Sequence, residues 1–174
     1  MGIVGTKTLV TYASKYGGTA GIAEKIGEVL REAGVETDVL PVDRVRDLAP
    51  YRAVILGSAV YIGGWRKPAV NFIRSREQEL SGRPVWIFSS GPTGPADQGA
   101  FMGGGLLPKA LLPVADRIHP RDVVIFGGAA FAERLKGLDK WILNNVKAPL
   151  GDFRDWAAIQ SWAEAIARDL KGQN

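Results

Sequence analysis

Strand-like and helix-like segments alternate along this chain, and this alternation constrains the fold more than any other feature of the sequence. The β-prone runs expected to form strands are residues 8–12, 35–42, 53–59, 85–89 and 123–126, and the expected helices are 20–33, 68–79, 106–118, 134–146 and 155–170. Such alternation is typical of a parallel sheet with right-handed crossovers and helices on both faces. We therefore predict one α/β domain over residues 1–174, with a doubly wound five-stranded parallel sheet.

The cysteine and histidine counts exclude several kinds of chemistry. The 174 residues include no cysteine, so disulfides, thiolate catalysis, cysteine-ligated zinc and iron–sulfur clusters are excluded. His119 is the one histidine. It precedes Pro120, before the expected fifth strand, and we expect it to be structural. We predict no metal site and no catalytic constellation.

Charge and hydropathy indicate the cellular location and the kinds of partner to expect for this chain. The formal net charge is +4 and the isoelectric point is near 9.5. This mild basic excess disfavours an acidic docking face, and it permits peripheral contact with a membrane or another anionic partner. No apolar run is long enough to span a bilayer, and the first residues lack the features of a secretory signal. We expect a cytoplasmic protein with no nucleic-acid partner.

A glycine-containing loop joins the first expected strand to the first expected helix. It comprises Ser14, Lys15, Tyr16, Gly17, Gly18 and Thr19. Ligands bind at this edge of an open α/β sheet, and a helix N-terminus there offers N–H groups and partial positive charge to a phosphate. Glycines let successive N–H groups form an anion nest, to which the hydroxyls add donors. Alternatively, Thr19 only caps the helix and the glycines only make a tight turn. The residues alone favour neither interpretation.

At this loop the sequence resembles the flavodoxins, whose first loop has the form S/T-x-T-G-x-T. Ser14, Gly17 and Thr19 match, whereas Tyr16 stands where flavodoxins usually have threonine. With the basic residue Lys15, the loop resembles more closely the branch of menaquinone-dependent protoporphyrinogen oxidases and their flavodoxin-domain relatives, which often carry a basic residue at this position. The resemblance implies a flavodoxin-like sheet of order 2-1-3-4-5 and non-covalent binding of FMN.

Two further loops follow strands at the same edge of the expected sheet. Parallel strands share their direction, so these loops and the first loop should converge on one crevice, with two of them bracketing a flavin ring. Aromatic side chains there can stack on the ring, and Tyr61 is the better candidate because it directly follows its strand. Trp65 could equally pack against the next helix. The expected ring-binding residues are Ala59, Tyr61, Ile62, Gly63 and Trp65 from the third strand, and Ser89, Ser90, Gly91 and Pro92 from the fourth.

Two segments beyond these loops could serve partners. The glycine-rich stretch 91–105 could be a lid or a docking loop. The basic and aromatic stretch 131–146 could meet a membrane or a macrocycle, but we favour an ordinary helix packed on the sheet.

Three functions are compatible with the sequence. The first is an FMN-dependent oxidoreductase similar to the protoporphyrinogen oxidases, passing electrons to a quinone. The second is a flavodoxin-type carrier between redox partner proteins or from a small-molecule electron donor, ranked lower because such carriers are typically acidic. The third is a flavodoxin-fold interaction module without cofactor. The sequence leaves open whether the protein is an enzyme, and it gives no oligomeric state.

Overall fold

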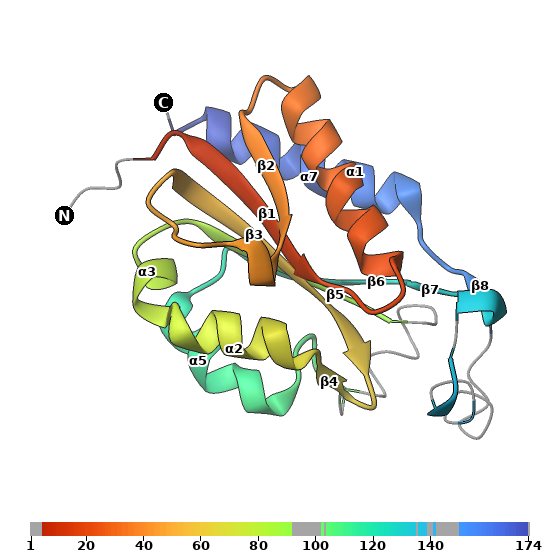
Figure 1. Ribbon diagram of the computed structural model, residues 1–174. Helices are drawn as coiled ribbons and strands as arrows, with labels where there is room; N and C mark the ends of the chain where they lie inside the picture. The colour runs from red at the N-terminus through yellow and green to blue at the C-terminus, as the bar shows by residue number, and fades with distance from the viewer. Residues whose placement is uncertain are drawn as a thin grey trace.

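The computed structural model describes residues 5–91, 102, 104–134, 136–138, 141 and 150–173. Its main sheet is built from parallel strands in the order β2 (Thr37–Pro41), β1 (Lys7–Ala13), β3 (Tyr51–Tyr61), β5 (Val85–Ser90) and β6 (Asp122–Phe126) (Figure 1). The predicted order 2-1-3-4-5 is therefore confirmed. Strand order reverses between β1 and β3, where open α/β sheets leave a crevice beyond the carboxyl ends of their strands.

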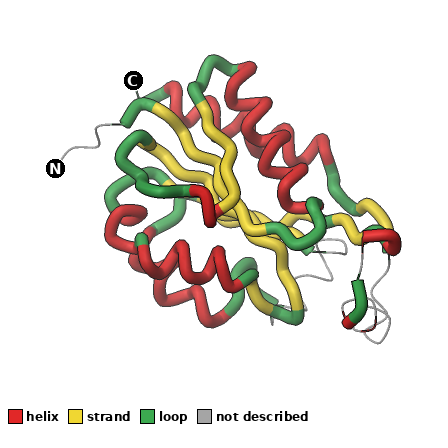
Figure 2. The backbone as a smooth tube through the Cα atoms, in the orientation of Figure 1, coloured by secondary structure: helices red, strands yellow, loops and turns green. Residues whose placement is uncertain are grey.

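Helices cover both faces of the sheet, as predicted (Figure 2). One face packs against α1 (Gly18–Glu32) and α7 (Trp156–Lys171), and the other against α2 (Lys67–Ser75), α3 (Glu77–Ser81) and α5 (Leu112–Ile118). Asp155 caps α7, because its carboxylate accepts a hydrogen bond from the Ala158 N–H at 3.0 Å.

The central strand β3 supplies both halves of the core because successive side chains point to opposite faces. Val54 and Leu56 join the cluster beneath α2, α3 and α5, whereas Ala53 and Ile55 join the cluster beneath α1 and α7. All four side chains are fully buried. A strand buried on both faces reads as a continuous apolar run, which is why its position could be predicted.

Gly57, near the carboxyl end of β3, is required by close packing. A Cβ atom at this position would lie 2.0 Å from Cζ of Phe88 on the neighbouring strand β5. The Phe88 ring in turn packs edge-on against Trp162 of α7, with ring centroids 6.1 Å apart. The glycine therefore lets a large aromatic side chain fill the layer between the sheet and α7.

Two predicted helices differ from the structure. The helix expected over 68–79 is divided into α2 and α3 at Arg76. The helix expected over 106–118 begins only at Leu112, after the 3₁₀ turn η2 (Lys109–Leu111). Proline explains the second difference: Pro113 lacks an N–H group and is tolerated in the first turn of a helix, not in its interior.

Short elements at the ends of the strands were not predicted. Strand β3 extends to Tyr61 and returns through the antiparallel β4 (Gly64–Trp65). Another antiparallel pair joins β7 (Ala129–Ala130) to β8 (Gly151–Asp152), and the 3₁₀ turns η1 (Val42–Arg44) and η3 (Ala132–Arg134) follow β2 and β7. These elements contain only two or three residues each, too few to produce a hydrophobic period.

Some predictions lie wholly or largely outside the described residues. Of the stretch 91–105, positions 92–101 and 103 are outside them, including Pro92. Of the helix expected over 134–146, only 134, 136–138 and 141 are described. Within the described ranges, no helix combines the length and apolar character needed to cross a bilayer.

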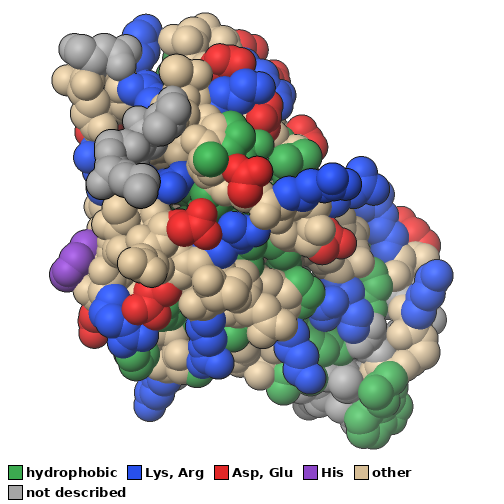
Figure 3. All heavy atoms as spheres, turned by 60° about the vertical axis from the view of Figure 1, so that its left-hand side comes forward, with side chains coloured by type: hydrophobic (Ala, Val, Ile, Leu, Met, Phe, Trp, Pro, Cys, Tyr) green, Lys and Arg blue, Asp and Glu red, His purple; other side chains and the backbone are tan. Residues whose placement is uncertain are grey.

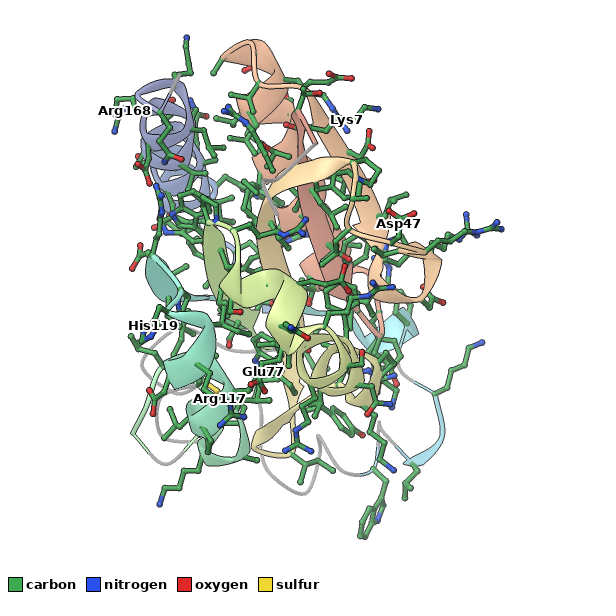
Figure 4. The ribbon with its side chains drawn as sticks, turned by 90° about the vertical axis from the view of Figure 1, so that its left-hand side faces the viewer. Lys7, Asp47, Glu77, Arg117, His119 and Arg168 are labelled. Atoms are coloured by element: carbon green, nitrogen blue, oxygen red, sulfur yellow. The ribbon has the colours of Figure 1, made fainter. Side chains whose placement is uncertain are left out.

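Charged side chains of both signs are interspersed on the face shown in Figure 3. One pair joins two helices: Arg117 of α5 donates Nε and Nη2 to the Glu77 carboxylate of α3, the second contact at 2.9 Å (Figure 4). His119 caps the same α5 helix with a φ of 53°. It precedes β6 and so lies at the amino edge of the sheet, away from the crevice, which agrees with its predicted structural position.

Candidate functional site

A pocket opens where the loops after β1, β3 and β5 meet. It is lined by Ser14, Lys15, Tyr16, Gly18, Thr19, Ala59, Val60, Tyr61, Arg66, Ser90, Gly91, Ala129 and Ala130. Three segments far apart in the sequence are thus brought together at the carboxyl edge of the sheet. The described lining includes two cationic side chains and no carboxylate, so its charge suits an anionic ligand.

The loop between β1 and α1 makes a tight turn that an internal hydrogen bond closes. Gly17 has a φ of 88°, a left-handed conformation that glycine adopts without strain, and its N–H donates to Ser14 Oγ at 3.1 Å. Helix α1 begins at the next residue with no side chain capping its first turn. N–H groups at an uncapped helix start are donors for an anion.

Gly18 lets the last wall of the pocket approach this loop. A Cβ atom at Gly18 would lie 3.2 Å from the backbone N and O of Ala129 in β7. The segment after β6 therefore packs directly on the start of α1. This contact brings Ala129 and Ala130 into the pocket, although they were not among the predicted site residues.

A buried hydrogen bond ties the first loop to the end of β5. Thr19 Oγ1 and Ser90 Oγ are 2.7 Å apart, and both residues are almost fully buried. Each hydroxyl can donate one hydrogen bond and accept others. Both side chains line the pocket, so the pair fixes two of its walls relative to each other.

Tyr61 presents an aromatic side chain to the pocket. The ammonium of Lys15 lies 4.4 Å from the centroid of the Tyr61 ring and 5.4 Å from that of Tyr16. Distances of this size are typical of cation–π contacts. The contact joins the first loop to the end of β3 and places a positive charge beside an aromatic face.

The hairpin after Tyr61 turns at two residues with positive φ, Ile62 at 50° and Gly63 at 72°. Positive φ at both central positions is the requirement of a type I′ turn, which matches the twist of antiparallel strands. It is unusual for a β-branched residue. The Ile62 side chain is 72% exposed, and neither turn residue lines the pocket with Tyr61.

Trp65 packs in the core in this structure, which favours its expected place against the next helix over a place against a flavin ring. Its side chain is only 6% exposed and belongs to the core cluster beneath α2. The indole Nε1–H donates to Ser89 Oγ at 2.8 Å. Ser89 is fully buried and does not line the pocket. Burial of the indole and its satisfied N–H favour the packing interpretation over the ring-stacking one.

Sequence reasoning missed four lining residues: Val60, Arg66, Ala129 and Ala130. The Arg66 backbone N–H donates to Ser58 Oγ at 3.1 Å, which holds the end of β4 against β3. A signal for the β7 wall did exist in the glycine pair 127–128. A Cβ atom at Gly128 would lie 1.4 Å from the Gly91 carbonyl oxygen, so only glycine allows the loops after β5 and β6 to touch.

The donor set fits a phosphate ester carrying a flat ring. The hydroxyls of Ser14 and Thr19 and the uncapped helix start are phosphate donors. Tyr61 also lines the pocket and offers an aromatic face. Beyond the first loop, the phenol of Tyr12 has a pKa raised by burial and then by the Glu24 charge, so this hydroxyl stays protonated.

Comparisons with known proteins point to one family. A family model described as a flavodoxin domain matches residues 9–156. The chain is 24% identical to a protoporphyrinogen IX dehydrogenase [quinone] of Leishmania major, over 92% of this chain and 74% of that protein. It is 20% identical to the protein of that name in Escherichia coli K12, over 92% and 94%. A solved flavodoxin from the domain Archaea has the same fold, with a TM-score of 0.63 and 16% identity over 95% of this chain and 99% of that one.

Proposed function

The chain belongs to the flavodoxin domain family, and we propose that it binds FMN non-covalently and uses it for electron transfer. The observation that carries this proposal is the pocket itself. Loops after β1, β3 and β5 meet there, and its lining combines hydroxyl and N–H donors with the Tyr61 ring. This is the arrangement that a mononucleotide with an aromatic base requires.

The residues divide the work of binding. Ser14, Thr19 and the first N–H groups of α1 hold the phosphate, and Lys15 adds positive charge beside them. Tyr61 stacks on the ring. Ser90 orients the Thr19 hydroxyl through their shared hydrogen bond. When bound, FMN supplies the redox chemistry, and the protein binds it, orients it and sets its potential.

For the reaction, we propose an oxidoreductase of the protoporphyrinogen oxidase type that passes substrate electrons to a quinone in the cytoplasm. Two relatives that align over 92% of this chain carry the name protoporphyrinogen IX dehydrogenase [quinone]. The basic net charge supports this reaction over an acidic electron shuttle.

The first experiment tests the cofactor. Purified protein should be yellow, and denaturation should release FMN, identified by chromatography against authentic FMN. If the protein is colourless, apoprotein titrated with FMN should quench the flavin fluorescence at one equivalent. Absence of both signals would mean a flavodoxin-fold module without cofactor, and the proposal would fail.

The second experiment tests the reaction. Under anaerobic conditions, the loaded protein is mixed with protoporphyrinogen and a menaquinone analogue, and the absorbance of the oxidised tetrapyrrole is followed. Turnover that requires both substrates supports the proposed oxidoreductase. A bound FMN with two well-separated one-electron potentials and no turnover would identify an electron carrier and overturn the proposed reaction alone.

A further inference from the structure

Arg134 reaches the first loop of the pocket from a segment more than one hundred residues away. It ends η3, and its Nη1 donates to the backbone carbonyl of Tyr16 at 3.2 Å. The same Nη1 would lie 3.3 Å from a Cβ atom at Gly17. The guanidinium therefore rests on the turn whose N–H groups and hydroxyls we assign to the phosphate.

The other described contact of this guanidinium is with an aromatic ring and not with a carboxylate. Its central carbon lies 5.2 Å from the centroid of the Phe131 ring. In the described part of the chain, no aspartate or glutamate comes within ion-pair distance of Arg134. Arginine carries five N–H donors in a planar fork that matches phosphate geometry. One donor to a carbonyl leaves the fork able to bind an anion.

A second arginine near the start of α1, Arg154, differs from Arg134 in its partners. Arg154 also packs against the start of α1, with Nη1 2.6 Å from a Cβ position at Gly21. However, Asp152 neutralises it through contacts at 2.8 and 2.6 Å. Two arginines thus approach the same end of α1, and only the one at the phosphate turn has no described carboxylate partner.

Arg134 contacts the loop at the residue that departs from the pattern which the loop resembles. Its pattern resembles S/T-x-T-G-x-T, in which Tyr16 replaces a threonine and so removes one short hydroxyl from the turn. Arg134 binds the carbonyl of that residue. A charged donor from outside the loop therefore stands beside Tyr16, which has no short hydroxyl of its own to offer.

We propose that Arg134 is a phosphate ligand of the flavin site and that it makes the site select the phosphorylated flavin, FMN, over riboflavin. This inference rests on the proposed binding of FMN and adds a specificity-determining residue from outside the three predicted loops. A guanidinium–phosphate contact is charge-assisted, so it is stronger than a neutral hydrogen bond and is weakened by salt.

The test compares two ligands that differ only in the phosphate. Apoprotein, its Arg134→Gln variant and the control Lys136→Gln are titrated with FMN and with riboflavin, following flavin fluorescence. Lys136 is exposed in the same segment, so its variant makes the same change in net charge. Arg134→Gln should weaken FMN binding by about 10- to 100-fold. Riboflavin binding should stay unchanged, and Lys136→Gln should change neither affinity.

A second variant and a salt series complete the test. Arg134→Lys keeps the charge without the planar fork and should lose several-fold in FMN affinity, again with riboflavin unaffected. Between low and high NaCl, wild-type affinity for FMN should fall more steeply than that of Arg134→Gln.

Three results would overturn the inference. Equal losses for FMN and riboflavin in Arg134→Gln would mean that Arg134 only holds the Tyr16 carbonyl. Unchanged FMN affinity would mean that it has no role in binding. Wild-type protein that binds neither flavin would refute the proposed function itself, a result distinct from the first two.

Discussion

Thr19 and Ser90 share a hydrogen bond of 2.7 Å between their hydroxyl oxygens, inside the protein and 71 residues apart in the sequence. The bond joins the start of α1 to the end of β5, the two elements that flank the proposed flavin site. A side chain that both shapes the pocket and donates to its ligand should affect binding more than a neighbour of equal size elsewhere.

Thr19→Val should weaken FMN binding several-fold or more, because valine keeps the volume of threonine and removes the donor. It also leaves the buried Ser90 hydroxyl without its partner. The measurement is a fluorescence titration of apoprotein with FMN. Affinity equal to that of the wild type would mean that the first loop has been assigned wrongly.

Thr11→Val is the matched control and carries a prediction of its own. Thr11 lies in β1 with 0% exposure, and its hydroxyl has no hydrogen-bond partner among the described residues. Replacing a buried, unpaired hydroxyl by a methyl group should raise the free energy of unfolding by about 1 kcal/mol. FMN affinity should not change. Urea unfolding measures the first effect, and a loss of stability would contradict it.

Substitutions at Tyr61 and Trp65 should have different effects, the first on FMN affinity and the second on the free energy of unfolding. Tyr61→Leu removes the aromatic face of the pocket, so FMN should bind more weakly and its bound absorbance spectrum should change. Trp65→Phe removes the donor to Ser89 from the core, and it should lower the free energy of unfolding by about 1–3 kcal/mol with little change in FMN affinity. A large loss of FMN affinity in Trp65→Phe would indicate that Trp65 contacts the flavin ring.

Gly57→Ala should destabilise the protein through the Phe88 ring. The added methyl group would overlap that ring, and overpacking of this kind costs about 1–3 kcal/mol. Gly82→Ala is the control, because its Cβ position has only ordinary contacts at 3.7 Å or more and its φ is −86°. Thermal unfolding of both variants tests the difference, and equal melting temperatures would contradict it.

Asp152 should contribute a pH-dependent part of the stability. Hydrogen bonds from Arg154 hold the pKa of this carboxyl below its ordinary value of 3.8. A lowered folded-state pKa stabilises the fold above the unfolded value and loses that effect as pH falls through the folded value. Asp152→Asn should therefore cost stability at pH 6 and progressively less below pH 3.8. A cost that does not vary with pH would show that the charge is not involved.

The repeating elements of this fold could be read from the sequence because their causes are local. The apolar run around Ile55 predicts a buried strand, and the spacing of Ile159, Ala163 and Ile166 predicts the last helix, since periodicity follows from which face is buried. The first loop could be located for a similar reason. Its glycines and hydroxyls directly follow a strand and open a helix.

Tertiary structure decided the positions of side chains that contact residues far away in the sequence. Trp65 is a core residue because β4 folds back on β3 and carries the indole to Ser89. Ala129 and Ala130 reach the pocket because glycines 18 and 128 allow backbones to approach closely, a condition that no local period encodes. Arg134 reaches the first loop through the Tyr16 carbonyl, 118 residues away in the sequence. The sequence by itself determined the sheet, its helices and the position of the loop that we propose for the phosphate. Long-range packing determined which side chains surround that loop, because contacts between remote segments are fixed only when the whole chain is folded.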